Sequence, residues 1–327
     1  MMALLLTLIA NIGVTSLVGS FRLALTDWLE TRLSADFYVT AGVINADTIA
    51  GEAWVRSAHR RVVAETSFAG RTMTVVGVDV GAPDFGPANV IDGAPNSFID
   101  WSLGSGKIER VFANEQLRYL AGVKVGDTIA LETELGARLF EVLGFFHDYG
   151  NVNFSVHLPS HRFNKLYSSA KPQGWGLWIT DDEQDAAELG LSKLGLEPTQ
   201  WVSQGDVLAL SLAIFDRTFA ITRALNTLTL LVAAVAIFTS LLAVYQFRRP
   251  EYALWRSLGM SWSVFFAVSG FSIVLMTIVV MALALPLGVA LSWLLIHKIN
   301  VISFGWTMPV IVCLLYTSDA ADEVSWV

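Results

Sequence analysis

Three long apolar runs dominate the pattern of the chain: residues 1–21, 227–247 and 257–296 contain no charged side chain. Because an α-helix rises about 1.5 Å per residue, each run is long enough to cross a hydrocarbon core about 30 Å thick. The third run exceeds one span. It contains Pro286, which either kinks one long helix, the interpretation we favour, or separates two short segments. The pattern predicts three membrane-spanning helices.

Helical periodicity continues beyond the first run and begins before the second. In both places apolar residues recur at the spacing of one helix face. These residues are Phe21, Leu25, Trp28, Leu29 and Leu33, and Leu208, Leu212, Phe215 and Phe219. We expect two antiparallel stalk helices, 22–34 and 206–226, that bury these faces against each other or a second copy, with Asp206 as the cap of the second. The alternative is a pair of ordinary domain helices that end at the membrane.

The region between the stalks has a different pattern. Alternating positions and β-branched residues predict strands, with short helical patterns between them. The expected strands are 36–40, 71–80 and 139–146, the expected helix is 182–194, and residues 111–131 form a strand, short helix, turn and strand. Gly126 and Asp127 supply the turn. The mixture favours an α+β domain over a doubly wound sheet.

Composition and charge separate these parts further. The chain is 54% hydrophobic and 15% charged, with a mean hydropathy of +0.55, which is typical of a membrane protein. Residues 22–226 hold 25 of the 29 acidic and 17 of the 21 basic residues, so they carry the whole net charge of -8 and do not suit a nucleic acid partner. The short segment after the second run holds Arg248, Arg249 and Arg256 against Glu251. That excess predicts a cytoplasmic loop, which places the acidic domain outside.

These patterns predict a membrane α-helical protein, with three spans plus a truncated fourth, an inserted extracytoplasmic α+β domain and helical stalks. The predicted segments are transmembrane helix 1 at 1–21, the extracytoplasmic domain at 22–226 with stalks at 22–34 and 206–226, transmembrane helix 2 at 227–247, a cytoplasmic loop at 248–262, transmembrane helix 3 at 263–298, and an outer loop with the start of transmembrane helix 4 at 299–312. Residues 313–327 form an acidic run that resembles the conceptual translation of a sequencing adaptor. We expect this tail, which includes the single cysteine Cys313, to be non-native and the chain to be a fragment; a natural acidic tail is the alternative.

Candidate catalytic residues are few. Gly104-Ser105-Gly106-Lys107 lacks the first glycine and the following hydroxyl of a phosphate-binding loop, so it is predicted to be a turn. His147, His157 and His161 are expected on a loop as surface or hydrogen-bonding side chains, because their spacing is not that of a zinc site. No catalytic residue, cofactor or metal is predicted, and the chain is not expected to be an enzyme. Four tryptophans have the positions of an interfacial belt: Trp28, Trp262, Trp293 and Trp306.

The charged segment at 248–262 contains helix punctuation at both ends. Pro250 suits the first residue of a helix, and Gly259 suits a left-handed stop. We expect a short helix at 250–258. Its faces are Tyr252, Trp255 and Gly259 on one side, and Leu254 and Leu258 on another. Two interpretations are open at this point: a helix seated in the lipid headgroups, or a helix that docks a partner.

The sequence RPEYALWRSLGMS at 249–261 resembles the motif RxxE(L/Y)AxLRxLGMS of FtsX-like ABC transporter permeases of the MacB and LolC/LolE type. In those permeases the segment between the second and third spans is a coupling helix that docks in a groove of the cytoplasmic ATPase. The resemblance implies that ten residues serve this docking: Arg249, Pro250, Glu251, Tyr252, Ala253, Leu254, Trp255, Arg256, Leu258 and Gly259. Trp255 stands where the family usually has leucine, which should alter the fit in the groove.

Other stretches carry the same resemblance over nearly the whole chain. Residues 215–219 and 222–226 resemble the family's entry into the second span, and residues 114–115 and 122–128 resemble a motif of its periplasmic domain. The first helix resembles that of the second half of large permeases in which the periplasmic module occurs twice. The missing fourth span and the lack of a basic residue before the first depart from the family's pattern, as expected of a fragment.

The resemblance implies a multi-pass permease subunit of the bacterial inner membrane, with a large MacB-like periplasmic domain. It would couple ATP hydrolysis by a separate cytoplasmic ABC ATPase to motion of that domain, for export or extraction of a lipid, lipoprotein, peptide or drug. The other expected partners are a second permease copy or module, membrane lipid and a periplasmic accessory protein. The alternative is a membrane-anchored sensor with a periplasmic ligand-binding domain. A sensor should continue from its second span into a long signalling helix, whereas residues 248–261 are followed at once by another apolar run.

Overall fold

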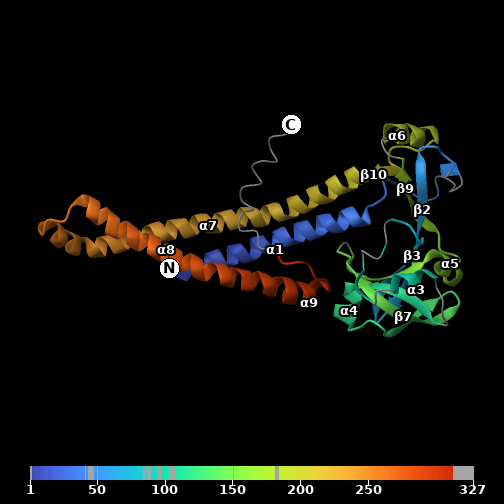
Figure 1. The fold of residues 1–327 in the computed structure, drawn as a ribbon, viewed down its shortest axis with the longest axis horizontal. Coiled ribbons are helices and arrows are strands. Elements are labelled where there is room, and N and C mark those ends of the chain that lie inside the picture. Colours follow the sequence, from blue (N-terminus) through green and yellow to red (C-terminus); the bar gives the residue numbers. More distant parts are fainter. Residues whose placement is uncertain are drawn as a thin grey trace. The chain divides into compact units, whose positions relative to one another are not determined.

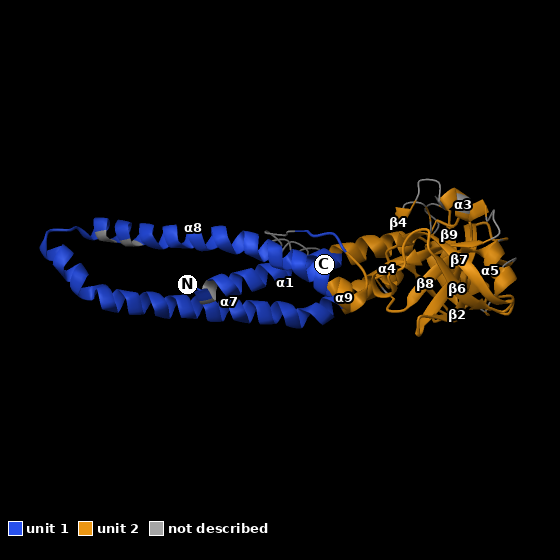
Figure 2. Ribbon diagram, turned by 90° about the horizontal axis from the view of Figure 1, so that it is seen from below, with its two compact units in different colours: residues 1–22, 215–299, 308–327 blue, residues 23–214, 300–307 orange. Residues whose placement is uncertain are grey.

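The computed structural model describes residues 2–40, 42, 48–49, 51–83, 86, 90–93, 97–103, 108–149, 151–180 and 184–311 (Figure 1). The chain divides into two compact units, coloured separately in Figure 2. Unit 1 comprises Met1–Arg22, Phe215–Ile299 and Met308–Val327, and unit 2 comprises Leu23–Ile214 and Asn300–Thr307. The predicted turn at 104–107 and the tail at 313–327 lie outside the described residues.

Three long helices contain the apolar runs. They are α1 (Met2–Arg32), α7 (Gln204–Ser257) and α8 (Trp262–Leu294), and α8 continues into a π-helical turn, η2 (Leu295–Asn300), and the short α9 (Val301–Phe304). Three described segments are long and apolar enough to cross a membrane: Leu5–Arg32, Gln204–Ser257 and Trp262–Phe304. Of the two alternatives for the third run, the structure has one continuous helix, because α8 passes through Pro286 without a break.

Within unit 1, α1 and α7 pack against each other in opposite directions. The rings of Phe21 and Phe215 contact each other with centroids 5.3 Å apart. Nearer the N-terminus of α1, Asn11 Nδ2 donates to the carbonyl oxygen of Asn226 at 3.5 Å. Residue numbers therefore rise along α1 as they fall along α7, which is the antiparallel arrangement expected of the stalk helices.

Small residues bring α1 close to α8 in unit 1. A Cβ atom on Gly13 would lie 2.9 Å from Leu291 Cδ2, and one on Gly288 would lie 2.7 Å from Ile12 Cγ2. Close approach through glycine is typical of helix packing in membranes, where apolar surface alone does not drive association.

The predicted start of α7 is wrong by a few residues. The helix follows Ser203, whose hydroxyl accepts from the N–H of Asp206 at 3.1 Å and donates to Asp206 Oδ2 at 2.7 Å. Ser203 is therefore the cap of α7, and its hydroxyl bonds both the backbone N–H and the carboxylate of Asp206.

The short helix predicted at 250–258 is also not a separate element, because α7 continues through Pro250 to Ser257. A proline inside a helix has no N–H to donate and crowds the carbonyl of the preceding turn, so it bends the helix rather than starting one when the residues before it are already helical. Figure 2 shows the last turns of α7 bent toward α8.

Unit 2 contains a ten-stranded mixed sheet in the order β10-β1-β9-β2-β3-β8-β5-β7-β4, with β6 paired to β7. The strands are β1 (Phe37–Thr40), β2 (Val55–Phe68), β3 (Arg71–Val78), β4 (Val90–Gly93), β5 (Glu109–Asn114), β6 (Thr128–Thr133), β7 (Gly136–Phe146), β8 (Phe154–Pro159), β9 (Pro172–Ile179) and β10 (Trp201–Ser203). Its helices are α3 (Ser97–Leu103), α4 (Glu115–Ala121), α5 (Ser160–Leu166) and α6 (Gln184–Lys193). The expected α+β architecture is confirmed, since both parallel and antiparallel strand pairs occur.

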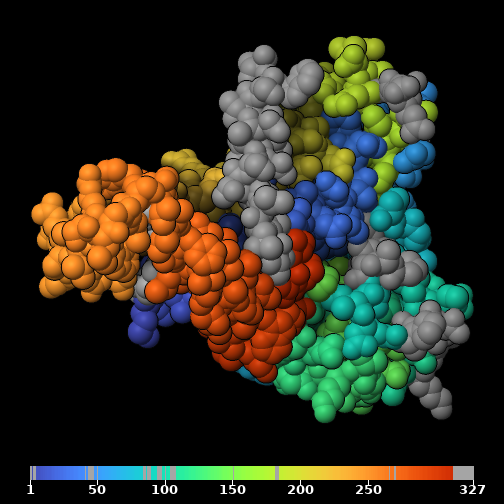
Figure 3. Space-filling model, turned by 60° about the vertical axis from the view of Figure 1, so that its left-hand side comes forward, coloured from blue at the N-terminus to red at the C-terminus, as the bar shows by residue number. Residues whose placement is uncertain are grey.

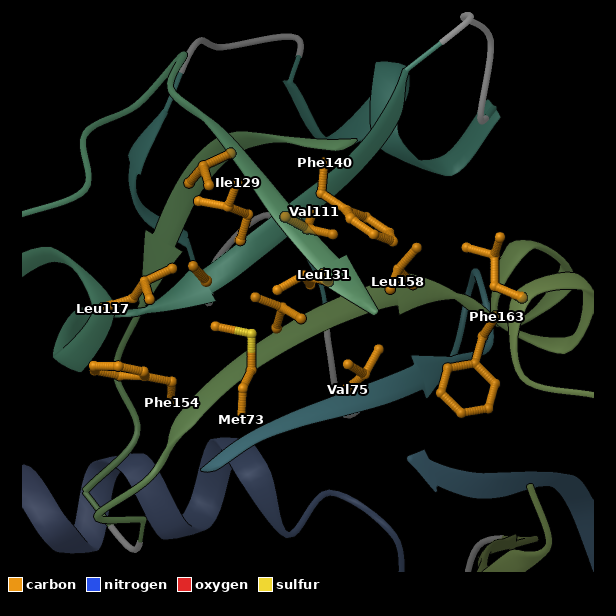
Figure 4. Packing of buried hydrophobic residues seen from close by; sticks show 14 of the residues in the cluster. Met73, Val75, Val111, Leu117, Ile129, Leu131, Phe140, Phe154, Leu158 and Phe163 are labelled. Atoms are coloured by element: carbon orange, nitrogen blue, oxygen red, sulfur yellow. The ribbon is translucent and has the colours of Figure 1, made fainter. Parts of the chain in front are cut away.

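The strand β2 joins two lobes of this sheet. Its first half pairs with β9 and its second half with β3. The core on the β3 side, shown in Figure 4, includes Met73, Val75, Val111, Phe140 and Phe154. The core on the β9 side includes Phe37, Ile49, Leu177, Ala187 and Leu191. The cores are distinct clusters because β9 and β3 lie on opposite edges of β2.

Candidate partner-docking surface

The turn between α7 and α8 has a defined backbone geometry. Gly259 has a φ of 90°, its N–H donates to the carbonyl of Arg256 at 3.0 Å, and the N–H of Met260 donates to that of Trp255 at 3.2 Å. These two bonds form a Schellman motif, in which a left-handed glycine satisfies the last carbonyls of a helix. The stop predicted at Gly259 is confirmed.

Aromatic and arginine side chains line the inner side of this turn. The Arg256 guanidinium lies 4.1 Å from the ring centroid of Trp262, the first residue of α8. Tyr252 contacts both Tyr245, at 5.9 Å, and Trp255, at 5.8 Å. The cation–π contact of Arg256 with Trp262 joins the end of α7 to the start of α8, whereas the two ring contacts of Tyr252 lie within α7. The contacts enclose a small cavity of about 230 Å³, lined by Tyr245, Arg249, Tyr252, Ala253, Arg256, Met260, Ser261 and Trp262.

The outer side of the same helix carries an exposed stripe of four residues: Phe247, Glu251, Leu254 and Leu258. The exposed fractions are 85% for Phe247, 61% for Leu254 and 79% for Leu258, and Glu251 is exposed as well. Their spacing of four, three and four residues places them on one helix face. We call these four residues the docking stripe. In the space-filling view of Figure 3, the end of α7 and the start of α8 form the orange end of unit 1.

The ten residues predicted from the sequence are thereby divided between two faces. Tyr252 and Trp255 are half-buried on the inner side, whereas Glu251, Leu254 and Leu258 face outward. Phe247 was missed because the helix was expected to begin at Pro250. The signal that could have found it is its position four residues before Glu251.

A second cluster of interactions lies in unit 2, around the carboxylate of Glu115 at the start of α4. Glu115 is only 2% exposed, and its Oε2 lies 2.8 Å from His147 Nδ1. Thr307 donates to the same carboxylate from its N–H at 3.1 Å and from its hydroxyl at 2.7 Å. We call Glu115, His147 and Thr307 the Glu115 joint. It connects the segment that follows α9 to the sheet domain.

Aromatic rings surround the Glu115 joint. Trp28 Nε1, near the end of α1, donates to the carbonyl of His147 at 2.9 Å. Tyr149 packs against Trp28 at 5.9 Å and against Trp306 at 4.9 Å. Trp306 is 6% exposed, so the prediction that it belongs to an interfacial belt is wrong. The Trp306 indole is buried inside unit 2, in the segment that follows α9.

The three histidines are not on one loop, contrary to the prediction. His157 lies inside β8, and His161 lies in α5, while His147 follows β7 directly. Burial holds the pKa of His157 well below its usual value, and the nearby charges of Arg32 and Arg61 lower it further. His157 is therefore a neutral core residue.

No family model matches this chain. The chain is 27% identical over 331 aligned residues to a protein of Mycobacterium tuberculosis (strain ATCC 25618 / H37Rv) described as the uncharacterized ABC transporter permease protein Rv0987. The match covers 94% of this chain, and the chain spans 38% of the length of that relative. The resemblance to an ABC transporter permease is confirmed.

Two solved structures overlap about half of the chain. One is the extracellular domain of the noncanonic ABC-type transporter YknZ from Gram-positive bacteria, with 14% identity, a TM-score of 0.34, and coverage of 51% of this chain and 89% of that one. The other is the periplasmic region of MacB from Actinobacillus actinomycetemcomitans, with 12% identity, a TM-score of 0.36, and coverage of 57% and 98%.

Proposed function

We propose that this chain is the membrane permease part of an ABC transporter whose ATPase is a separate cytoplasmic subunit. The relationship to an ABC transporter permease along most of the chain supports this. The three apolar helices support a multi-pass location in the bacterial inner membrane. The arginines at 248, 249 and 256 favour a cytoplasmic α7–α8 turn, which would put the α+β domain in the periplasm.

The docking stripe is the observation that carries the proposal. Its apolar side chains are exposed around Glu251, while the inner side of the same turns is occupied by aromatic contacts. A helix that offers a stripe of this spacing to an apolar groove is a common mode of recognition. The ATPase would supply the groove, with a basic group opposite Glu251.

Continuity of α7 supports a mechanical role for this contact. One helix of 54 residues runs from the cap at Ser203 to the docking stripe. ATP-driven closure of the ATPase would displace the stripe, α7 would carry the displacement outward, and α1 would move with α7 through their antiparallel contacts. The periplasmic domain could then extract or export a lipid, lipoprotein, peptide or drug without passing it through the bilayer.

The apolar part of α7 supports a further partner in the membrane. None of the most hydrophobic window of α7 is buried by the described residues, against 28% for α1 and 17% for α8. Membrane lipid and a second permease copy or module would cover this surface.

Co-purification tests the proposal. The permease, expressed from its intact gene, is captured with the tagged ABC ATPase of the same locus, and wild type is compared with the Glu251→Lys, Leu254→Asp double variant. A matched control, Glu188→Lys with Leu189→Asp, makes the same changes on the exposed face of α6. Because hot-spot residues contribute about 2 kcal/mol or more each, the stripe variant should lose at least about 30-fold in affinity while the control keeps wild-type binding.

Two results would overturn the proposal. If the permease and the ATPase purify apart, or if the stripe variant retains the ATPase as well as the control does, the segment is an interfacial helix. The membrane-anchored sensor would then explain the chain better.

A further inference from the structure

The cavity of about 230 Å³ on the inner side of the α7–α8 turn has a positively charged lining. Arg249 and Arg256 line it together with side chains that carry no charge. The whole cavity lies within unit 1, because the end of α7 and the start of α8 both belong to that unit. An anion that entered the cavity would therefore meet two guanidinium groups.

The carboxylates of the surrounding helices do not neutralise this charge. Residues 224–296 contain one carboxylate, that of Glu251, and residues 2–21 of α1 contain none. Glu251 follows Arg249 by two residues and precedes Arg256 by five, so at 3.6 residues per turn it lies on the other side of α7. Within the described part of the chain, neither arginine forms a salt bridge. The cavity therefore favours an anion.

Aromatic rings orient both guanidinium groups. The Arg249 guanidinium lies 5.7 Å from the ring centroid of Tyr245, and the Arg256 guanidinium lies 4.1 Å from that of Trp262. A guanidinium group that packs on an aromatic face keeps the N–H donors of its edge for another group. Phosphate oxygens match these donors in geometry as well as in charge. Two oriented guanidinium groups in one cavity therefore suit a phosphate group.

Exposed apolar side chains continue from the cavity along both helices. On α7, Phe238 and Leu241 precede Tyr245 by seven and four residues, so the three share one helix face, and all three are exposed. On α8, the exposed Phe266 stacks on Trp262 with ring centroids 5.9 Å apart. Pockets that enclose a whole ligand measure about 300 to 1,000 Å³, so the smaller cavity suits a headgroup whose apolar chains stay outside.

We propose that this cavity binds the phosphate group of a membrane phospholipid. The two guanidinium groups would hold the phosphate, and the apolar faces of α7 and α8 would contact the acyl chains. The inference rests on the proposed function in one respect, the position of the turn at the cytoplasmic membrane surface, where basic residues attract anionic headgroups. It does not depend on docking of an ATPase, because the docking stripe lies on the other side of α7. The lipid would stabilise the inner side of the turn and leave the outer side available.

Isothermal titration of the full permease, expressed from its intact gene and kept in a neutral detergent at low ionic strength, tests the site. The probes are dihexanoyl phosphatidylglycerol, inorganic phosphate, and dihexanoylglycerol, which has the same chains without a phosphate. Because the site combines a phosphate group with acyl chains, wild type should bind phosphatidylglycerol at least tenfold more tightly than either of the other probes.

Arginine variants locate the binding. Arg249→Gln should weaken binding of phosphatidylglycerol at least tenfold, because it removes one of the two guanidinium groups. The matched control is Arg248→Gln, which makes the same change at an exposed neighbour that does not line the cavity. An arginine that only attracts an anionic surface contributes up to about fivefold, so the control should lose no more than that. Should Arg249→Gln fail to fold by thermal unfolding, Arg249→Lys and Arg248→Lys, which keep the charge but lose the guanidinium fork, carry the same comparison.

Three results would overturn the inference. Phosphatidylglycerol that binds no better than dihexanoylglycerol would show that the phosphate is not recognised. Inorganic phosphate that binds as tightly as phosphatidylglycerol would indicate a site for a soluble phosphate compound. Equal losses in Arg249→Gln and Arg248→Gln would indicate general attraction to a basic surface.

The titration contains no ATPase, so its outcome is separate from that of the capture experiment. If the phospholipid does not bind and Arg249→Gln loses the ATPase on capture, an acidic side chain of the ATPase occupies the cavity, and the lipid inference alone is overturned. If the phospholipid binds as expected and the ATPase is not captured, the inference holds and the proposed docking is overturned.

Discussion

The docking stripe and the Glu115 joint use similar side chains in opposite ways. Each is centred on a glutamate near aromatic residues. Glu251 is exposed and its stripe neighbours project away from the chain, whereas Glu115 is 2% exposed and accepts two hydrogen bonds from Thr307. A carboxylate that is buried and satisfied contributes to the fold, while an exposed one beside apolar side chains is available to a partner.

This difference assigns the two regions different parts in the proposed function. The stripe can change without disturbing its own unit, so it suits a surface that receives force from another protein. The Glu115 joint fixes the chain after α9 to the sheet domain, so it suits the point at which that force is delivered. The predictions below test this contrast, from the largest expected effect to the smallest.

The largest effect is expected from removing the two glutamates in turn. Glu115→Ala leaves Thr307 and His147 without their buried partner, and loss of one member of a buried charged network costs about 3 kcal/mol of unfolding free energy. Glu251→Ala changes an exposed side chain and should stay within about 0.5 kcal/mol of wild type. Urea unfolding of the full chain, followed by tryptophan fluorescence, measures both.

Thr307→Val provides an independent test of the joint, because it removes the hydroxyl that donates to Glu115 at 2.7 Å and keeps the side-chain shape. It should destabilise by about 1 to 2 kcal/mol. Equal stability of the Glu115→Ala and Glu251→Ala variants would remove the basis of the comparison.

The next effect concerns packing in unit 1, where α1 and α8 are in contact but the α7–α8 turn is open. Gly288→Ala puts a Cβ atom 2.7 Å from Ile12 Cγ2, whereas Gly270→Ala, also in α8, meets nothing within 4 Å. Alanine favours a helix over glycine by about 1 kcal/mol, and overpacking costs about 1 to 3 kcal/mol. The Gly288 variant should therefore be the less stable of the two by about 2 kcal/mol in thermal unfolding. The reverse order would mean that this helix contact does not stabilise unit 1.

Much of this architecture could be predicted from the sequence because its signals are local. The apolar runs fixed the three long helices, and the alternation of residues 71–80 and 139–146 corresponds to β3 and β7. The two faces at Tyr252 and Leu254 followed from helical spacing alone. The strands β2, β4, β8, β9 and β10 were not predicted; β8 is buried on both faces, and β9 is interrupted by glycines.

The parts that could not be predicted depend on distant contacts or on competing signals. Glu115 meets His147 across 32 residues and Thr307 across 192, so no local pattern reveals their meeting. At Pro250, the preference of proline for a helix start competed with the continuation of an already formed helix, and continuation won. Phe247 was overlooked for the same reason.

A pH-dependent effect tests burial on the sheet side of the comparison. The pKa of His157 is held well below 6.5 by burial, with Arg32 and Arg61 adding to the effect. Below about pH 6.5 the unfolded chain binds a proton that the folded chain does not. The free energy of unfolding therefore decreases as the pH is lowered, by up to about 1.4 kcal/mol per pH unit. His157→Leu should flatten the dependence by one proton, measured by urea unfolding between about pH 7.5 and 5.5. His161→Leu, which removes an exposed histidine, should change it much less, and equal slopes for wild type and His157→Leu would contradict the assignment.

The smallest effect is expected on the inner side of the α7–α8 turn. Arg256→Gln removes the guanidinium that lies 4.1 Å from the Trp262 ring centroid, and cation–π contacts at exposed sites contribute about 0.5 to 1 kcal/mol. Arg256→Lys keeps the charge and should lose less. Both variants leave the docking stripe unchanged, so we expect a small drop in thermal stability and a drop in ATPase capture of no more than about fivefold. A complete loss of capture would mean that Arg256 contacts the partner directly, and the division into a structural inner face and a binding outer face would then be wrong.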